Sequence, residues 1–276
     1  MTGSLYLGDN MVLFRGDYKS KALTKRTPIN VILPADNKSF IDNTVEDIKK
    51  PYKTLYLFHG MFGNCDVFPA NTVIQKFAED HNLAVVLPSC DNSFYLDRPD
   101  EFLYYSKYVG EELIDFTRSV FPLSDKREDT FIAGFSMGGY GALRTGLKYS
   151  EKFSAIGAIS PAVVTHFLNQ AQDNMEDIMI SKQYAESVFG PLDKVVGTDK
   201  DPEFLIDSLL KEGKEIPDLY MAVGDNDFLK PEILSFHEFL KGKNIPVEFH
   251  LDKGEHTWEF CNEHIKQFVE KITFKS

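Results

Sequence analysis

Short apolar runs alternate with longer segments of helical periodicity along the chain after Pro51. Runs bounded by turn-forming residues predict strands at residues 54–58, 84–87, 130–133, 155–159, 219–223 and 247–251. Apolar residues spaced three and four apart predict helices at residues 67–80, 106–121, 138–149, 231–243 and 258–271. Alternation of strand and helix is typical of a mainly parallel sheet with helices on both faces. The pattern therefore predicts an α/β fold.

Two regions depart from this rhythm. Residues 4–14 and 29–33 alternate or cluster apolar positions between turn-forming residues, which predicts antiparallel strands at one sheet edge. Residues 162–213 are more polar and contain two Gly-Pro or Asp-Pro interruptions, which predicts two or three short helices inserted over the sheet. No internal repeat and no linker rich in Gly, Ser or Pro divides the sequence. We therefore expect a single domain over residues 1–276, with residues 162–213 as a small lid.

Composition limits the kinds of molecule that the protein is expected to bind. A chain of 276 residues with 43% hydrophobic positions can bury one large core. The formal net charge of -12 argues against a nucleic-acid-binding surface, because such binding depends on clustered Lys and Arg. We therefore expect a small molecule as the partner and no nucleic acid.

The cysteine count and the lengths of the apolar runs indicate the cellular compartment in which the protein is expected. Cys65, Cys90 and Cys261 make an odd count, which favours free thiols in a reducing compartment over a disulfide framework. The first 30 residues show no basic stretch followed by an apolar run, and no run of about 18 apolar residues occurs in the sequence. We expect a cytoplasmic protein without membrane contact, and the sequence leaves open whether it forms a homo-oligomer.

A candidate nucleophile lies between a predicted strand and a predicted helix. Residues 134–138 read G-F-S-M-G and match the G-x-S-x-G pattern of a strand-to-helix turn that exposes a serine. Side chains at the two flanking glycines would clash in such a tight turn. We therefore predict Ser136 as the nucleophile. The alternative interpretation is a glycine-rich structural turn with an ordinary capping serine.

A serine nucleophile needs a histidine base and an acid that orients it. On this type of fold the acid and the histidine follow the serine in chain order, on loops after the last strands. His256 lies in such a loop, whereas His264 falls on the polar side of a predicted helix and is interpreted as a solvated surface residue. Residues 224–229 offer two carboxylates, of which we choose Asp227, and Asp225 stays open as the alternative.

Backbone amides can supply the donors for the negative charge that develops on the carbonyl oxygen. One is predicted to be the N–H of Met137, directly after the nucleophile. The other is expected from the loop at residues 58–64, where we choose Met61. In the same loop His59 precedes the serine and ends a strand, so we interpret it as a structural hydrogen-bonding residue.

Metal chemistry has little support in the sequence. Residues 237–241 read H-E-F-L-K and so lack the second histidine of the zinc helix motif. The three cysteines lack paired metal-ligand spacing, and no dinucleotide or phosphate-binding loop pattern is complete. We therefore expect no metal and no cofactor.

Five blocks of sequence carry a resemblance to a known family, at residues 59–64, 93–95, 134–142, 224–229 and 256–260. Together they resemble the esterase D-like carboxylesterases, which include tributyrin and acetyl esterases, S-formylglutathione hydrolases and feruloyl esterases. The resemblance covers roughly residues 26–272. It implies the α/β-hydrolase fold, a small-molecule ester substrate, and hydrolysis of short acyl esters through an acyl-enzyme. It also implies Asp227 as the acid and Met61 and Met137 as the oxyanion amides.

Substrate identity stays open at this point. A feruloyl esterase or an S-formylglutathione hydrolase is the alternative within the family, and an acyltransferase or a non-catalytic binding protein of the same fold lies further away. We expect residues 162–213, Phe62 and Trp258 to form the walls of the substrate pocket.

Overall fold

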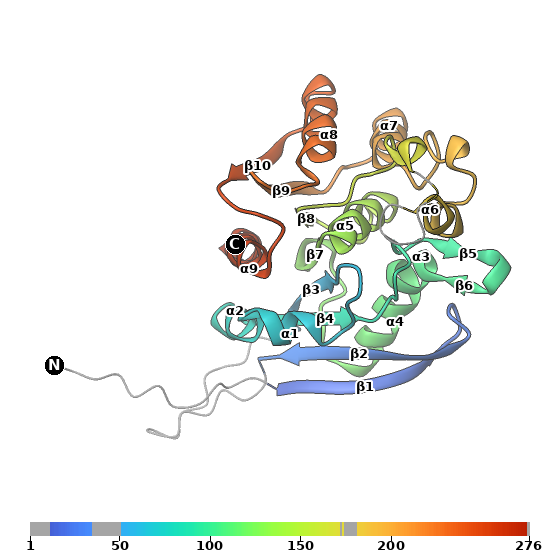
Figure 1. The fold of residues 1–276 in the computed structure, drawn as a ribbon. Helices are drawn as coiled ribbons and strands as arrows, with labels where there is room; N and C mark the ends of the chain where they lie inside the picture. Colours follow the sequence, from blue (N-terminus) through green and yellow to red (C-terminus); the bar gives the residue numbers. More distant parts are fainter. Residues whose placement is uncertain (1–11, 35–50, 172, 174–180, 275–276) are drawn as a thin grey trace, which may run out of the picture.

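The computed structural model describes residues 12–34, 51–171, 173 and 181–274. An eight-stranded sheet crosses it in the order β1-β2-β4-β3-β7-β8-β9-β10 (Figure 1). The strands are β1 (Val12–Ser20), β2 (Lys25–Leu33), β3 (Lys53–Phe58), β4 (Leu83–Pro88), β7 (Thr130–Phe135), β8 (Ala155–Ile159), β9 (Asp218–Gly224) and β10 (Val247–Asp252). Neighbouring strands from β4 to β10 in this order are parallel, whereas β2 runs antiparallel to both β4 and β1. The mainly parallel sheet and its antiparallel edge are confirmed.

The antiparallel edge differs in extent from the prediction. Strand β1 pairs with β2 from Val12 opposite Leu33 to Ser20 opposite Lys25, so both strands extend beyond the short runs seen in the sequence. Polar and charged residues in this hairpin mask its periodicity. The remainder of the predicted first strand, residues 4–11, lies outside the described residues.

Helices cover both faces of the sheet, as predicted. The helices are α1 (Val67–Asn71), α2 (Ile74–Asp80), α3 (Tyr105–Lys107), α4 (Leu113–Val120), α5 (Met137–Lys148), α6 (Lys182–Phe189), α7 (Pro202–Glu212), α8 (Lys230–Gly242) and α9 (Trp258–Phe274). Helices α1, α2 and α9 contribute to the hydrophobic cluster on one face, and α4, α5 and α8 to the cluster on the other. Along β3, Tyr56 and Phe58 belong to the cluster with α4, α5 and α8. Leu55 and Leu57 belong to the cluster with α1, α2 and α9. Burial on both sides explains why the strand is an uninterrupted apolar run.

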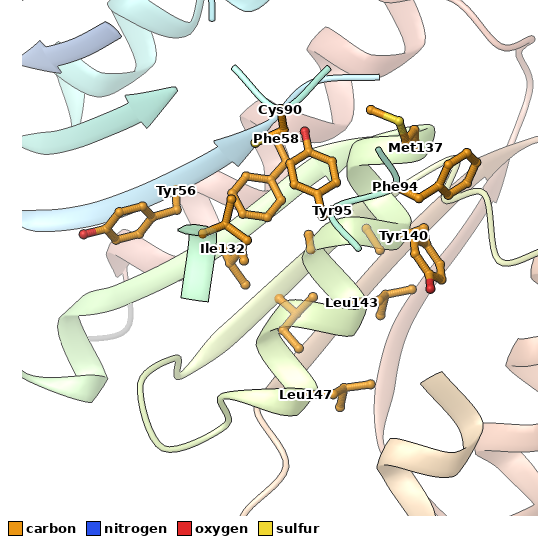
Figure 2. Close-up of a cluster of buried hydrophobic side chains, with 14 of the residues drawn as sticks. Tyr56, Phe58, Cys90, Phe94, Tyr95, Ile132, Met137, Tyr140, Leu143 and Leu147 are labelled. Atoms are coloured by element: carbon orange, nitrogen blue, oxygen red, sulfur yellow. The ribbon is translucent and has the colours of Figure 1, made fainter. Parts of the chain in front are cut away.

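Figure 2 shows the cluster on the α5 side. Phe58 stacks on Tyr95 with ring centroids 4.3 Å apart, and Leu143 and Leu147 of α5 belong to the same cluster as Ile132 of β7. This packing holds the helix that follows the candidate nucleophile against the sheet.

Two predicted helices are divided in the structure. Residues 67–80 form α1 and α2, separated at Thr72 and Val73, where the Thr72 hydroxyl donates to Phe68 O and accepts from Ile74 N. A threonine that bonds its neighbouring backbone competes with helical bonding and so ends one helix and begins the next. Residues 106–121 form α3, a π-helical turn at Tyr108–Glu112 and α4 in direct succession. A small hairpin of β5 (Asp97–Arg98) and β6 (Leu103–Tyr104) is too short for a periodic signal.

The segment expected to be inserted over the sheet contains α6 and α7 together with short 3₁₀ turns at Leu168–Gln170 and Leu192–Lys194. Helix α7 begins where the Asp201 carboxylate accepts the Glu203 N–H, with Pro202 at the first helical position. It ends at Gly213, which has a positive φ of 63°. Residues 172 and 174–180 of this segment lie outside the described residues.

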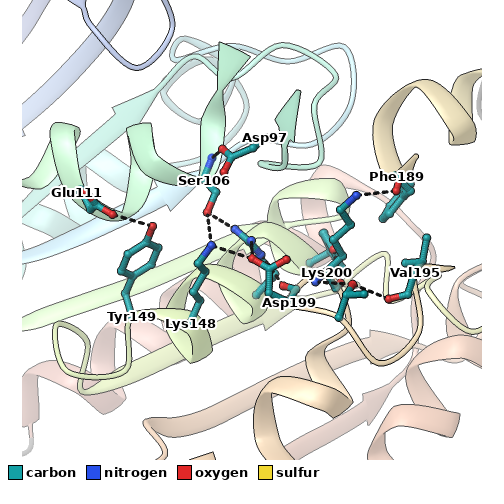
Figure 3. Close-up of polar contacts among 12 residues, drawn as sticks. Asp97, Ser106, Glu111, Lys148, Tyr149, Phe189, Val195, Asp199 and Lys200 are labelled. Carbon is teal, nitrogen blue, oxygen red and sulfur yellow. Dashed lines mark hydrogen bonds and ion pairs between the residues drawn. The ribbon is translucent and has the colours of Figure 1, made fainter. Parts of the chain in front are cut away.

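Figure 3 shows how this segment is joined to the helix behind the candidate nucleophile. The buried guanidinium of Arg144 donates to the backbone and side-chain oxygens of Asp199, and Lys148 Nζ lies 2.7 Å from Asp199 Oδ2. Arg144 also donates to Ser106 Oγ, which connects the cluster to α3. Arg144 and Lys148 are one helical turn apart on α5, so one carboxylate is held by two cations.

Every helix in the described part of the chain is too short or too polar to span a bilayer.

Candidate active site

Ser136 occupies a strained turn between β7 and α5. Its backbone has φ 60° and ψ −122°, a conformation that L-residues rarely adopt. The turn is tight because a Cβ added at Gly134 would lie 2.2 Å from Gly138 O, and one at Gly138 would lie 2.1 Å from Phe58 O. The two glycines of the motif are thus required by sterics, and the alternative of an ordinary capping serine lacks support because the Ser136 side chain makes no capping hydrogen bond.

Backbone hydrogen bonds hold this turn on both sides. Ser136 N donates to Ile159 O at 3.0 Å, and Ser136 O accepts from Ala162 N at 3.0 Å. The serine therefore sits at the carboxyl edge of the central strands, where ligand sites of open α/β sheets lie. Its side chain lines a cavity of about 450 Å³, a volume suited to a small ligand.

Met61 and Met137 line the same cavity as Ser136. Met137 is the first residue of α5, so its N–H has no acceptor within the helix. Within the described residues, neither the Met137 N–H nor the Met61 N–H donates a hydrogen bond. Two unpaired amides next to a serine are suited to bind a negatively charged oxygen.

The loop that carries Met61 is held by His59. Cys90 N donates to His59 Nε2 at 2.9 Å, so the imidazole is neutral with its proton on Nδ1, which donates to Gly60 O at 2.7 Å. Burial lowers the pKa of His59 and favours this neutral form. His59 therefore has the structural hydrogen-bonding role that the sequence indicates.

Asn92 holds the other side of this loop. Its Oδ1 accepts the Phe62 N–H at 2.8 Å, and its backbone oxygen accepts the Tyr184 hydroxyl of α6 at 2.8 Å. Phe62 has a positive φ of 61°, so this hydrogen bond stabilises a strained residue next to Met61. Asn92 thus connects the loop to the inserted segment.

His256 and Asp227 meet although they come from different loops. His256 Nδ1 lies 3.0 Å from Asp227 Oδ2 and 3.2 Å from Oδ1. The imidazole stacks on Phe135, the residue before Ser136, with ring centroids 4.6 Å apart. The ring of Phe228 also lies near the imidazole, with centroids 4.6 Å apart. Since Nδ1 donates to the carboxylate, Nε2 of the neutral ring is the atom free to accept a proton.

Asp227 is buried yet remains ionised. Burial alone would raise the pKa of Asp227, but the hydrogen bond with His256, the nearby Ser160 hydroxyl and the Leu229 N–H together lower the pKa below 3.8. The Leu229 N–H donates to Asp227 Oδ1 at 2.9 Å. The carboxylate is therefore both charged and fixed in direction.

Asp225 has a different partner. Its Oδ1 accepts the Gly254 N–H at 3.0 Å, and its own N–H donates to Asp252 O at 2.8 Å. Asn226 N also donates to Gly254 O at 3.0 Å. Asp225 thus joins the loop after β9 to the loop after β10, and the structure brings Asp227, not Asp225, to His256.

His264 is not the solvated residue that its place in the helix indicates. Its side chain is 2% exposed, and its Nδ1 lies 2.8 Å from the hydroxyl of Tyr220. Burial lowers the pKa of His264 and so favours the neutral form. The expectation of a surface position is wrong because the polar stripe of α9 packs against β9 and β10 at this residue.

The two residues expected in the pocket wall lie elsewhere. Phe62 is 68% exposed, and Trp258 packs against Phe68 and Phe135 with ring centroids 5.3 and 5.4 Å away. Neither lines the cavity at Ser136 as the described residues form it. Trp258 instead supports Phe135, and through it the face on which His256 rests.

Most of the lining of this cavity comes from residues 162–213, the segment expected in the pocket wall, and includes Phe167, Tyr184 and Phe189. The sequence analysis does not assign Phe94, Phe228 or Glu232 to the wall. Phe94 and Phe228 lie in blocks that carry the family resemblance, which is a usable signal, whereas Glu232 lies within a predicted helix. In the described part of the chain, no group of three or more His, Cys, Asp or Glu side chains is arranged to hold a metal ion.

Comparison with known proteins decides the family. The family model described as "Putative esterase" matches residues 20–272. The chain belongs to this family of esterases. An acetyl esterase of Caldicellulosiruptor saccharolyticus is 42% identical over 262 residues, which span 94% of this chain and 97% of that protein. The esterase resemblance seen in the sequence is therefore confirmed, and the chain is a carboxylic ester hydrolase.

Solved structures agree with this family. The serine hydrolase FphF of Staphylococcus aureus, which binds fluorophosphonate, has a TM-score of 0.82 and 32% identity, covering 95% of this chain and 98% of that chain. The S-formylglutathione hydrolase FrmB of Staphylococcus aureus has a TM-score of 0.81 and 33% identity, covering 95% of this chain and 99% of that chain. The predicted α/β-hydrolase fold is confirmed.

Proposed function

We propose that this esterase hydrolyses short acyl esters of the acetyl type, with Ser136 as nucleophile, His256 as general base and Asp227 as the acid that orients it. The observation that carries the proposal is the shared cavity, in which Ser136 lies beside the unpaired amides of Met61 and Met137. The 42% identical acetyl esterase supports the acyl class. The pairing of His256 with Asp227 supports the roles of those two residues.

The proposed reaction has two steps, acylation and then deacylation of Ser136. Ser136 Oγ attacks the ester carbonyl carbon while His256 Nε2 takes the hydroxyl proton. The amides of Met61 and Met137 stabilise the resulting oxyanion, and Asp227 stabilises the imidazolium. When the carbon–oxygen bond to the alcohol breaks, His256 returns the proton to the leaving oxygen. Water then attacks the acyl carbon while His256 takes a proton from it. The bond from that carbon to Ser136 Oγ breaks, His256 returns the proton to Oγ, and the acid is released.

The inserted segment belongs to this proposal as a lid. Phe167, Tyr184 and Phe189 of residues 162–213 line the same cavity as Met61 and Met137, so we assign these residues to the substrate wall. We further propose that residues 162–213 form part of a single domain and do not fold separately, because Asp199 is bound to Arg144 of α5. A cytoplasmic location is proposed from the three free cysteines, all buried.

Labelling and turnover test the proposal together. The wild-type chain is expected to hydrolyse p-nitrophenyl acetate, and a fluorophosphonate probe is expected to attach to Ser136, identified by peptide mass spectrometry. Ser136→Ala should lower kcat by several orders of magnitude. The control Ser119→Ala, an exposed serine on α4, should retain both activity and labelling. Turnover by Ser136→Ala at the wild-type rate contradicts the proposed nucleophile.

A second substrate class has a specific observation in its favour. FrmB, at 33% identity over nearly its whole length, is an S-formylglutathione hydrolase. A panel of p-nitrophenyl esters of increasing acyl length, S-formylglutathione and methyl ferulate ranks the classes by kcat/KM. The acetyl proposal expects the highest kcat/KM for the shortest p-nitrophenyl esters, and a higher value for S-formylglutathione would replace it.

A further inference from the structure

One buried carboxylate oxygen in the cavity at Ser136 has no hydrogen-bond partner among the described residues. Glu232, in the first turn of α8, lines the same cavity as Ser136. Its Oε2 is buried and accepts no hydrogen bond from any described residue. Proteins seldom leave a buried charged oxygen unpaired, because its lost hydration then goes uncompensated.

Nothing else among the described lining residues neutralises this group. The lining is mostly apolar and aromatic, and it contains no Lys, Arg or His. The neighbouring Lys230 Nζ donates to Asp225 O, which lies in the loop after β9. The Tyr184 hydroxyl, which also lines the cavity, donates to Asn92 O.

The N-terminus of α8 does not supply a hydrogen-bond donor for the buried oxygen of Glu232 either. An acidic residue in the first turn of a helix interacts favourably with the helix dipole. Such a residue is usually exposed or accepts a free backbone N–H, whereas the buried oxygen of Glu232 accepts none from the described residues. Glu232 lies in the wall of the cavity that Ser136 also lines, and among the described residues its buried oxygen is left without a donor.

We propose that Glu232 is a specificity residue that accepts a hydrogen bond from a hydroxyl or ammonium group of the ester substrate. This inference rests on the proposed function, because it concerns the cavity that Ser136 serves. The substrate class is then a polar ester with a hydrogen-bond donor several bonds away from the carbonyl carbon. An ester that carries a carboxylate in the same place is disfavoured, because two carboxylates repel each other in a largely apolar cavity.

Matched pairs of substrates isolate this interaction. For the acyl side, p-nitrophenyl 6-hydroxyhexanoate is compared with p-nitrophenyl heptanoate, which carries a methyl group in place of the hydroxyl. For the alcohol side, 2-hydroxyethyl acetate is compared with propyl acetate. A third acyl ester, p-nitrophenyl 6-aminohexanoate, distinguishes an ammonium donor from a hydroxyl donor. The readout is the ratio of kcat/KM within each set.

The wild-type enzyme is expected to favour the donor-bearing member of at least one pair by about ten- to a hundredfold, the range of a hydrogen bond to a charged group. Glu232→Leu should reduce this ratio to about one. Glu232→Gln, which keeps an acceptor but not the charge, should retain part of a hydroxyl preference and lose an ammonium preference. The matched control Glu238→Gln alters an exposed carboxylate on the same helix and should keep the wild-type ratio.

Two results would overturn the inference. One is a wild-type enzyme that hydrolyses p-nitrophenyl acetate without any preference within the pairs. The other is a preference that survives in both Glu232→Leu and Glu232→Gln, with each variant folded by its thermal melting curve. Loss of the proposed function is distinguishable, since it shows as absence of p-nitrophenyl acetate turnover and of fluorophosphonate labelling at Ser136.

Discussion

His256 Nδ1 lies 3.0 Å from Asp227 Oδ2, and the two residues are 29 positions apart on loops that follow neighbouring strands. Because β9 and β10 are parallel, their carboxyl ends meet at the same edge of the sheet and bring the two loops together. Asp225 reinforces this arrangement through Gly254 N but does not contact the imidazole. Asp227 thus contacts the imidazole, whereas Asp225, two positions earlier, joins the two loops.

The first prediction follows from that separation. Asp227→Asn should lower kcat by about 10⁴-fold with a smaller change in KM, because the amide no longer holds the imidazole in the productive tautomer. Asp225→Asn keeps an oxygen acceptor for Gly254 N and should retain most activity. Steady-state kinetics with p-nitrophenyl acetate measures both. Equal losses in the two variants would mean that loop geometry, not the orienting carboxylate, limits the reaction.

The second prediction concerns the turn at Ser136. Gly138→Ala would place a Cβ 2.1 Å from Phe58 O, a backbone atom that cannot move without shifting β3. We expect the free energy of unfolding to fall by more than about 2 kcal/mol, with loss of activity. Urea unfolding and ester hydrolysis measure these effects.

Gly242, the last residue of α8, supplies the control for this glycine. A Cβ there meets nothing within 4 Å, so Gly242→Ala should raise the free energy of unfolding by up to about 1 kcal/mol. A Gly138→Ala variant as stable as Gly242→Ala would refute the steric argument.

Local sequence pattern predicts the central strands and the pairing of Asp227 with His256, but it fails where contacts between distant segments decide the structure. The central strands are buried on both faces, so their apolar runs are visible in the sequence. The break between α1 and α2 is less visible, because Val73 N donates to Asn262 Oδ1, a residue 189 positions away. Hydrophobic periodicity along the sequence does not indicate such a long-range hydrogen bond.

The same distinction applies within the site. Ser136, Asp227 and His256 lie in short motifs whose spacing carries information, and the structure brings Asp227 to His256 and Ser136 to the two amides. The walls depend on tertiary packing: Trp258 turns toward Phe68, and Glu232 enters the cavity from a helix that reads only as an amphipathic stretch. Sequence pattern therefore predicts the Asp227–His256 contact better than the positions of individual wall residues such as Phe62 and Trp258.

The third prediction concerns Asn92, which accepts the Phe62 N–H beside Met61. Asn92→Ala removes the acceptor and should let the strained Phe62 relax, which displaces the Met61 amide. Misplacement of one oxyanion donor is expected to lower kcat by about ten- to a hundredfold. Asn92→Asp retains the acceptor oxygen and should recover most of this loss. If Asn92→Asp is as impaired as Asn92→Ala in steady-state kinetics, the hydrogen bond to Phe62 is not the cause.

The last prediction concerns the pH dependence of the stability that the ion pairs of Asp199 contribute. Burial alone would raise the pKa of Asp199, but Arg144 and Lys148 outweigh burial and hold the pKa below 3.8. A carboxylate with a lowered pKa in the folded state stabilises that state above its ordinary pKa, and the stabilisation is lost as the pH falls through the lowered value. Asp199→Asn should therefore cost about 1 kcal/mol near neutral pH, a modest figure because the Asp199 side chain is 44% exposed.

The difference in unfolding free energy between wild type and Asp199→Asn should shrink as the pH is lowered below about 4. Urea unfolding between about pH 3 and pH 7 measures it. Glu238→Gln, which breaks an exposed ion pair with Lys241, serves as the control and should have little effect on stability at neutral pH. The sign of this pH dependence tests the ion pairs. If the difference in unfolding free energy grows on acidification, Asp199 is protonated more readily in the folded state than in the unfolded state. In that case Arg144 and Lys148 would not offset the burial of the carboxylate, and the ion pairs would not hold residues 197–201 against α5.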